Sequence, residues 1–182
     1  TGVGKEVFAQ AIHYDSPRKY KMMVALNCSA FTKDLLESEL FGHAEGAFTG
    51  AVKTKKGLIE EAQGGTLFLD EIGEMNHDLQ AKLLRVLETG EFYHVGDTKL
   101  RKADVRVIAA TNRNLEQESE SGHFRKDLFY RLSVFVITIP SLRERTEDIE
   151  ILANHFIQQF AFKTNKPAPK MTAGFMHALK SH

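Results

Sequence analysis

The strongest constraint on the fold is an alternation of short apolar runs with helical patterns through the first 140 residues. Apolar runs occupy residues 22–26, 66–69, 105–110 and 134–139, and each has the length of a buried strand. Apolar residues recur at helical spacing in segments between these runs. Strands that alternate with helices predict an α/β fold, in which crossover helices connect the strands of a parallel sheet.

Start and stop signals refine this interpretation. Helices are predicted over residues 5–13, 115–121 and 125–130, from a Thr32 cap to a Gly42 stop, and near residues 79–87 after an Asn76 cap. Residues 92–102 predict a β-hairpin. After Pro140, an amphipathic helix is predicted over residues 149–160, and Thr172 caps a last helix. We therefore expect an α/β part over residues 1–140 and the start of a separate helical lid over residues 141–182.

Composition excludes several classes of protein. The formal net charge is zero, so overall charge predicts neither a nucleic-acid nor a membrane partner, although it leaves a local basic patch open. Cys28 is the single cysteine, which rules out an internal disulfide and favours a reducing compartment. No apolar run approaches the ~20 residues that span a bilayer, and no signal peptide is evident. Both ends look cut, so we expect a piece of a larger protein.

The first residues carry a glycine-rich motif. Gly2-Val3-Gly4-Lys5 leads into the first predicted helix, as in the second half of a phosphate-binding P-loop. Glycines let backbone N–H groups point at phosphates, the helix N-terminus favours anions, and Lys5 can reach the β- and γ-phosphates. Glu6 replaces the usual Ser or Thr metal ligand, and the first Gly of the motif is absent. Taken alone, the pattern also fits a glycine-rich helix start.

Polar residues follow two of the predicted strands. Asp70 and Glu71 end the run at residues 66–69, and ligands bind beyond the carboxyl ends of parallel strands. Asp70 can hold a hydrated Mg²⁺, and Glu71 can polarise an attacking water. The alternative is a pair of solvated acids. Asn112, after the run at residues 105–110, can contact a γ-phosphate or orient the water, although Asn is also common at strand ends as a turn residue.

Two arginines lie six residues apart, at Arg125 and Arg131. On one continuous helix they would point in different directions, so we expect the helix to end between them. Arginine supplied across a subunit boundary can stabilise charge on a transferring phosphoryl group. A surface salt bridge, for example to Asp127, is the alternative that spacing alone favours.

A glycine-flanked segment, Gly46-Ala47-Phe48-Thr49-Gly50-Ala51, is harder to explain as structure alone. Glycine gives a loop its freest backbone, so Phe48 and Thr49 could form a presented contact surface. The alternative is a tight turn with Phe48 tucked into the fold. The eight histidines show no pair at i, i+4 beside a carboxylate, so we interpret them as surface or packing residues rather than metal ligands.

Taken together and in this order, these residues resemble the central AAA+ ATPase domain of bacterial enhancer-binding proteins that activate sigma-54 RNA polymerase. The resemblance covers nearly the whole chain. Its most specific element is the hexapeptide at residues 46–51. Residues 65–71 match the Walker B segment, residues 124–132 the arginine-finger segment, and residues 142–149 the stretch that leads into the lid.

The resemblance implies a fold and a set of roles. The fold is an AAA+ P-loop parallel sheet followed by a helical lid. The implied nucleotide residues are Gly2, Val3, Gly4, Lys5 and Glu6 for the phosphates, Asp70 for Mg²⁺, Glu71 for water activation, Asn112 as sensor I, and Asn27 as the amide that holds Glu71 inactive. Arg125 and Arg131 would reach the neighbouring protomer's site. Residues 46–51 would contact the sigma factor when ATP is bound, and the hairpin at residues 92–102 would help to move them.

The family further implies ATP hydrolysis in a cytoplasmic ring, expected to be a hexamer, with DNA bound only through domains outside these residues. The first P-loop Gly and the second sensor Arg are missing from the chain, so turnover is expected of the parent protein. Two other hypotheses remain open. One is a non-catalytic or truncated binding module of the same fold, and the other is a different P-loop ATPase that acts on DNA.

Overall fold

The computed structural model describes residues 2–181, and these divide into two compact units. The larger unit spans Val3–Val136, and the smaller unit begins at Ile137. Within the described residues, no helix has both the length and the apolar character needed to cross a membrane. The two units are described separately.

A three-stranded sheet forms the centre of the larger unit. Its order is β1 (Met23–Asn27), β4 (Thr66–Asp70) and β7 (Arg106–Ala109), and both pairs are parallel. Parallel strands need crossover connections, and the chain between them supplies helices. The predicted α/β fold with a parallel sheet is therefore confirmed. The register pairs Asn27 with Asp70, so the carboxyl ends of β1 and β4 lie level.

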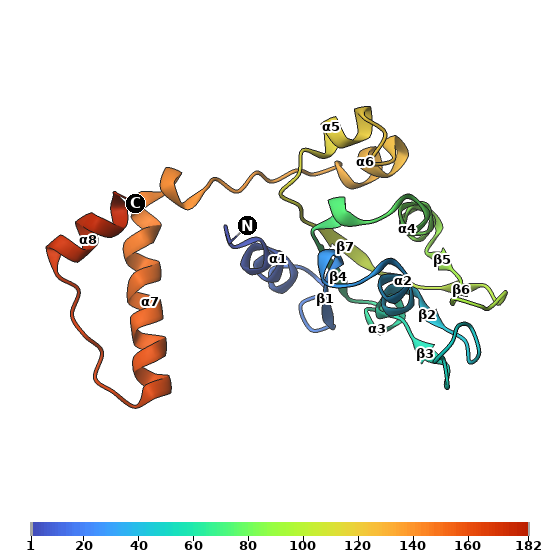
Figure 1. Ribbon diagram of the computed structural model, residues 1–182, viewed down its shortest axis with the longest axis horizontal. Helices are drawn as coiled ribbons and strands as arrows, with labels where there is room; N and C mark the ends of the chain where they lie inside the picture. Colours follow the sequence, from blue (N-terminus) through green and yellow to red (C-terminus); the bar gives the residue numbers. More distant parts are fainter. Residues whose placement is uncertain (1, 182) are drawn as a thin grey trace. The chain divides into compact units, whose positions relative to one another are not determined.

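Helices cover both faces of this sheet (Figure 1). The helices on the sheet are α1 (Lys5–Tyr14), α2 (Lys33–Phe41), α3 (Leu58–Glu61) and α4 (His77–Thr89). Helices α5 (Leu115–Glu120) and α6 (Lys126–Leu132) pack against each other, and α6 packs against α4. In Figure 1, α1 lies on one face, and α2, α3 and α4 lie on the other. Leu67 and Leu69 are fully buried in the core shared with α2, α3 and α4. Phe68, between them, points the other way, as the period of two in a strand requires.

Smaller elements complete this unit. Short 3₁₀ turns, η1 (Cys28–Ala30) and η2 (Ile72–Glu74), follow β1 and β4. Strand β2 (Gly42–His43) pairs antiparallel with β3 (Lys55–Lys56), and β5 (Glu91–Phe92) pairs antiparallel with β6 (Arg101–Lys102). The second pair confirms the predicted hairpin, with shorter strands than expected. Asn76 caps α4 by accepting from the backbone N–H groups of Asp78 and Leu79, as predicted.

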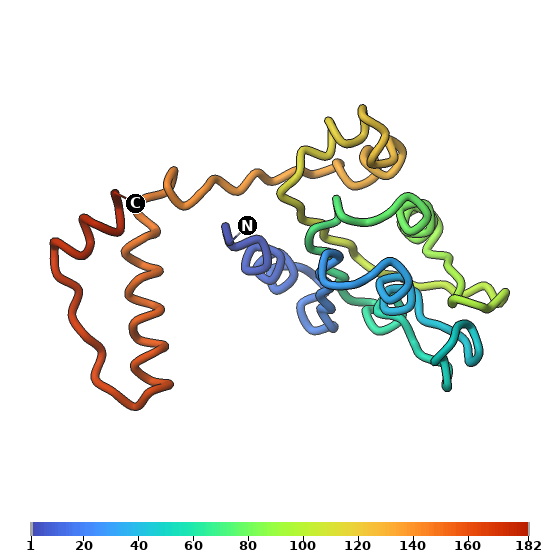
Figure 2. Tube along the Cα trace, in the orientation of Figure 1, coloured from blue at the N-terminus to red at the C-terminus, as the bar shows by residue number. Residues whose placement is uncertain are grey.

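The smaller unit is helical throughout its regular structure. It contains η3 (Leu142–Glu144), α7 (Thr146–Thr164) and α8 (Ala173–Lys180). Figure 2 follows the chain from α7 through an extended segment into α8. The Thr172 side chain accepts from the Phe175 N–H and caps α8, as predicted.

Two predictions were wrong, one about residues 134–139 and one about the extent of α6. Residues 134–139 form no strand: Val134 and Phe135 are each 82% exposed and pair with no strand among the described residues. Apolar β-branched residues favour a strand, but a strand also needs a hydrogen-bonding neighbour. The second error concerns α6, which does not end between the two arginines. Arg125 is its N-cap and Arg131 lies in its last turn.

Candidate functional site

The acidic pair lies where the central strand β4 leaves the sheet. Asp70 is its last residue, and Glu71 follows with φ 52° and ψ 47°. This left-handed conformation is uncommon for a residue with a Cβ and tends to occur at functional sites. Asp70 Oδ1 accepts from the Glu71 N–H at 3.0 Å, which helps to hold the turn. The turn directs the Glu71 side chain towards α1 and the end of β7.

Lys5 meets both acids. It is the first residue of α1, and its Nζ lies 2.6 Å from Glu71 Oε1 and 3.3 Å from Asp70 Oδ1. The Lys5 and Glu71 side chains are only 13% and 11% exposed. Burial disfavours the charged Lys5, but its hydrogen bonds to Glu71 and Asp70 prevail and raise its pKa. The structure thus brings together residues 66 positions apart in sequence.

The glycines before Lys5 leave open space beside it. Gly2 and Gly4 have φ of 79° and 94°, conformations that side chains rarely adopt. A Cβ added at either position would meet no other atom within 4 Å. Gly4 is also the N-cap of α1, where no side chain caps the helix. The first N–H groups of α1 therefore have no side-chain cap at this end.

Asn112 contacts Glu71 through its backbone. Its N–H donates to Glu71 Oε2 at 3.1 Å, so both carboxylate oxygens of Glu71 have a partner. Burial would raise the pKa of Glu71, but the hydrogen bonds from Lys5 and from the Asn112 N–H lower it. Asn112 therefore lies beside the acids, and its contact with Glu71 uses a backbone group that every residue except proline carries.

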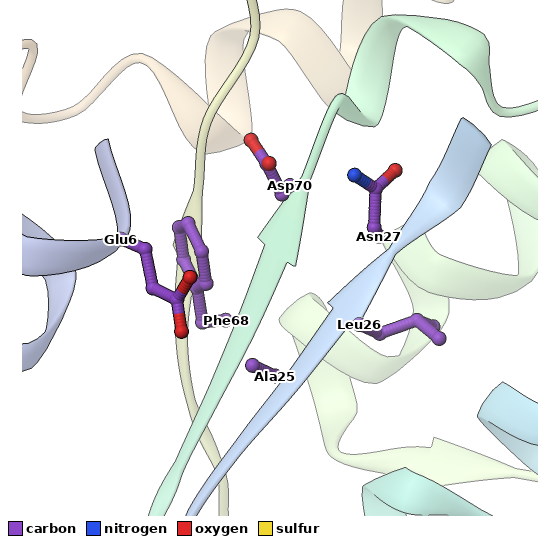
Figure 3. Close-up of a pocket in the computed structure, with 6 residues that line it drawn as sticks. All are labelled: Glu6, Ala25, Leu26, Asn27, Phe68 and Asp70. Atoms are coloured by element: carbon purple, nitrogen blue, oxygen red, sulfur yellow. The ribbon is translucent and has the colours of Figure 1, made fainter. Parts of the chain in front are cut away.

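Asn27 lies level with Asp70 but is bonded elsewhere. Its Oδ1 accepts from the backbone N–H and the hydroxyl of Ser29, at 2.9 and 2.7 Å, rather than contacting Glu71. A small pocket of about 140 Å³ opens between the strand ends and α1. Figure 3 shows its six lining residues: Glu6, Ala25, Leu26, Asn27, Phe68 and Asp70. Its volume is below that of a typical pocket for an entire small molecule.

No cluster of three or more His, Cys, Asp or Glu side chains suited to a metal occurs within residues 2–181. Nor is Cys28 an activated thiol, because burial together with the charges of Asp70 and Glu71 raises its pKa to about 12.

The two arginines are accessible and have partners on their own unit. Arg125 forms a two-point ion pair with Asp127, at 3.0 and 2.7 Å, which raises the pKa of Arg125 and lowers that of Asp127. Arg131 is exposed and donates to the Leu87 carbonyl at 2.9 Å. Neither contacts the carboxylates at the sheet edge.

Gln80 was missed by the sequence analysis. It is fully buried in α4, and its Oε1 accepts from the Arg125 N–H at 2.8 Å, while its Nε2 donates to the Met75 carbonyl at 2.6 Å. This amide anchors the start of α6 and so positions Arg125. Nothing in the sequence marks Gln80, because a glutamine in an amphipathic helix normally indicates the solvent face.

The glycine-flanked segment is a compact loop between β2 and β3. The Gly46 N–H donates to the Ala51 carbonyl at 2.8 Å, and the Ala51 N–H donates to the Phe48 carbonyl at 2.9 Å. Gly46 and Gly50 have φ of 77° and 102°. Thr49 is exposed and Ala51 is buried. Phe48 is 42% exposed and lies against the His43 ring. This arrangement is intermediate between a fully presented Phe48 and a Phe48 that is tucked into the fold.

The β5–β6 hairpin supports this loop. The Ala44 N–H donates to the Val95 carbonyl at 3.0 Å, and the Val95 N–H donates to the Gly42 carbonyl at 2.9 Å. A Cβ added at Gly96 would lie 2.7 Å from the Ala47 Cβ, so only glycine permits this approach. The hairpin and residues 46–51 are therefore in direct contact. The spacing of residues in the sequence does not indicate this contact.

Comparisons with known proteins agree with this arrangement. The Sigma-54 interaction domain model matches residues 1–138, and an AAA+ ATPase lid domain model matches residues 143–182. The chain is 54% identical over 182 residues to the Nif-specific regulatory protein of Azotobacter vinelandii, covering 100% of the chain and 35% of that protein. It is 50% identical over its full length to the anaerobic nitric oxide reductase transcription regulator NorR of Escherichia coli strain K12, covering 36% of it.

Solved structures show the same fold. NtrX from Brucella abortus in complex with ADP has a TM-score of 0.92 at 41% identity, covering 100% of the chain and 40% of NtrX. Hsp104 has a TM-score of 0.62 at 20% identity over 87% of the chain and 31% of Hsp104, a likeness of fold alone. The chain spans about a third of the length of the curated relatives. It belongs to the Sigma-54 interaction domain family of AAA+ transcriptional activators and continues into the AAA+ lid domain.

Proposed function

We propose that the chain is the ATP-hydrolysing part of an activator that remodels sigma-54 RNA polymerase through residues 46–51. The observation that carries this proposal is the cluster of Lys5, Asp70, Glu71 and the Asn112 N–H at one edge of the parallel sheet. A phosphate-binding lysine, a metal-binding carboxylate and a general base are the groups that ATP hydrolysis requires. The NtrX structures were determined with ADP and with ATP, which supports nucleotide binding here.

Residues 2–6 fit a phosphate group. The left-handed glycines and the open space beside them allow a phosphate to approach the backbone at the start of α1. Lys5 is charged and within reach of the same space. In the present arrangement its ammonium contacts Glu71 and Asp70, so a bound phosphate would have to attract Lys5 away from them.

Asp70 and Glu71 would have different roles in hydrolysis. Mg²⁺, when bound, would neutralise charge on the phosphates, and Asp70 is the residue that would hold it. The lack of a ready-made cluster of metal ligands within the described residues fits this ion, because Mg²⁺ usually takes only one or two carboxylates together with substrate phosphates. Glu6 stands at the pocket beside Asp70, where a hydroxyl is usual.

Glu71 would act as the base. Its lowered pKa keeps the carboxylate ionised and able to accept a proton. The water oxygen attacks the γ-phosphorus, the bond to the bridging oxygen of ADP breaks, and the water proton passes to Glu71. Lys5 occupies Oε1 in the present arrangement, so movement of Lys5 towards a phosphate would also free Glu71 for this step. Asn112 would be the sensor I residue, and Asn27 would hold Glu71 inactive until the nucleotide state changes.

Arg125 and Arg131 would complete the pocket of a neighbouring copy in a ring, expected to be a hexamer. Arg131 is exposed, and the Arg125 side chain is 37% exposed in its ion pair with Asp127. This accessibility supports the role, because a solvated ion pair exchanges readily for a phosphate. Such an arginine finger is worth ~10³–10⁵ in rate. We further propose a cytoplasmic protein, residues 1–140 as the nucleotide-binding part, residues 141–182 as the start of the lid, and DNA contact only through other domains.

The decisive experiment mixes two inactive variants. A protein that extends beyond residues 1–182 at both ends is expected to hydrolyse ATP, and its specific activity should rise with protein concentration. Arg125→Ala and Glu71→Gln are each expected to lose turnover, and mixing them is expected to restore part of it. In a mixed ring, some sites receive an intact Glu71 from one subunit and an intact Arg125 from its neighbour.

The matched control is Arg85→Ala. Arg85 is also exposed and paired with a carboxylate, Glu91 at 3.2 Å, and it should keep full activity. An extended protein that binds no nucleotide would reject the enzyme and favour the non-catalytic binding module. ATPase activity that DNA stimulates and sigma-54 does not would favour the other P-loop ATPase.

A further inference from the structure

A buried histidine lies beneath the loop at residues 46–51. His43 is 9% exposed, and its Nδ1 is hydrogen-bonded to the Ser38 hydroxyl at 2.7 Å. Ser38 is itself buried in α2. A buried imidazole with one nitrogen bound to a side chain of a packed helix has a fixed ring orientation. From sequence alone, His43 was interpreted with the other histidines as a surface or packing residue.

The fixed ring supports Phe48. The centroids of the two rings are 5.0 Å apart and their planes are inclined by 66°, the edge-to-face arrangement that aromatic rings prefer. Phe48 is 42% exposed, so the covered side of its ring includes the contact with His43, which restricts the orientation of the ring. Next to it, Thr49 and Gly50 form the exposed tip.

The backbone of His43 is held on both sides. It pairs with Lys55 in the β2–β3 ladder and forms a bridge with Val95 of the hairpin. The preceding Gly42 is tightly enclosed, because a Cβ there would lie 2.6 Å from the Lys55 carbonyl oxygen and 2.9 Å from His94 Nε2. His43 is therefore a fixed point, whereas the loop that contacts it is flanked by Gly46 and Gly50.

We propose that His43 is the positioning residue of this loop: oriented by Ser38, it holds Phe48 edge-on so that the Thr49 tip is presented in one arrangement. This deepens the proposed function and rests on it for the identity of the partner, sigma-54. Glycines at both ends leave the loop many conformations. Without the ring contact, the partner would have to order the loop as it binds. The affinity for the partner would then fall in proportion to the fraction of molecules in which the loop already has the binding conformation.

The test uses a fluorescent reporter in the full chain. The sequence contains no tryptophan, so Phe48→Trp introduces a single indole at the contact. In that background, His43→Leu removes the ring and Ser38→Ala removes only the hydroxyl that orients it. Both are expected to increase quenching of the indole by acrylamide, with the larger increase for His43→Leu. His43→Phe retains an aromatic ring and is expected to restore part of the protection.

The matched control is His13→Leu. His13 is 1% exposed, and its Nδ1 lies 2.9 Å from the Thr66 hydroxyl, so it loses the same kind of buried pair on another part of the fold. It should leave quenching of the indole unchanged. Equal increases for His13→Leu and His43→Leu would show a general loosening and overturn the proposal. So would an indole that stays protected in both His43→Leu and Ser38→Ala. If His43→Leu does not fold, Ser38→Ala decides.

A second measurement connects the contact to the partner. Affinity for purified sigma-54 is measured with the nucleotide-bound protein that has Phe48 intact. Removing an edge-to-face contact should weaken binding by roughly two- to tenfold in His43→Leu, and His13→Leu should bind normally. If the unsubstituted protein fails to bind sigma-54, the proposed function fails, and the quenching result still decides the role of His43. Unchanged affinity in a His43→Leu protein that binds sigma-54 overturns the positioning role.

Discussion

The sheet-edge site and the loop at residues 46–51 are built in opposite ways. At the sheet edge, charged side chains from α1 and β4 contact each other directly, and the carboxylate of Glu71 has a partner on each oxygen. In the loop, glycines with positive φ, short backbone hydrogen bonds and one ring contact hold the chain. The first region is organised before any ligand arrives, and the second retains the backbone freedom to change.

This difference has a physical consequence. A ligand at the sheet edge must compete with an internal ion pair, so binding there redistributes charge without refolding. A change in the loop needs only the loss of weak contacts, and such segments belong to the less stable part of a fold. We therefore expect substitutions in the two regions to have separable effects on hydrolysis and on partner binding.

The largest expected effect separates the two regions. Glu71→Gln should reduce ATP turnover by about 10²–10⁴-fold, the usual contribution of a general base, while ATP still binds. Thr49→Ala should leave turnover intact and abolish binding to sigma-54. Turnover and sigma-54 binding are measured for both variants. A Thr49→Ala protein that unfolds would show that the loop belongs to the core, and the comparison would fail.

A smaller effect is expected at Gln80. Gln80→Leu leaves the Arg125 N–H and the Met75 carbonyl without their buried partner, which should lower the free energy of unfolding by about 1–3 kcal/mol. Denaturant unfolding measures this change. Gln63→Leu is the control, because exposed Gln63 also accepts from a backbone N–H, that of Asp104 at 2.9 Å, and should cost less. Equal losses would mean that burial of the amide is unimportant.

Gly96→Ala tests the contact between the hairpin and the loop. Gly96 has φ of 73°, and its added methyl group would meet the Ala47 Cβ at 2.7 Å. We expect a loss of about 1–2 kcal/mol in stability, together with weaker sigma-54 binding and unchanged nucleotide affinity. Gly122→Ala is the control: Gly122 also has a positive φ, 80°, but an added Cβ would meet no atom within 4 Å. This substitution should lower stability without changing sigma-54 binding.

The smallest effect concerns pH. The pKa of Glu71 is lowered by its partners, so its stabilising contribution is present above the ordinary Glu value of about 4.3 and is lost as pH falls through the lowered value. Glu71→Gln cannot ionise. The unsubstituted protein and Glu71→Gln should differ in unfolding free energy by about 1 kcal/mol or less, because desolvation offsets the attraction. This difference should shrink as the pH falls through the lowered pKa of Glu71. A difference independent of pH would mean that the ion pair contributes nothing.

Much of the sheet-edge site was predictable because its signals are local. An apolar run that ends in Asp70 and Glu71 indicates a buried strand with acids at its carboxyl end, and parallel strands place such ends together. A glycine before Lys5 at a helix start indicates an anion site in the same way. The contact between Lys5 and Glu71 follows from the fold once both predictions are made.

Other features had no local signal. Gln80 reaches Arg125 across 45 positions, and Gly96 meets Ala47 from a separate hairpin. Residues 134–139 have strand composition but lack a strand to pair with among the described residues. Each of these outcomes depends on which segments become neighbours.

By itself, the amino-acid sequence determined the alternation of strands and helices, the acids at the end of β4 and the glycine-flanked loop, because periodicity and turn chemistry act over a few residues. Only the tertiary structure decided that Asn112 contacts Glu71 through its backbone, that Gln80 anchors the start of α6, and that His43 lies under Phe48. Those contacts join residues that chain connectivity leaves independent, and packing alone brings them within hydrogen-bonding or van der Waals distance.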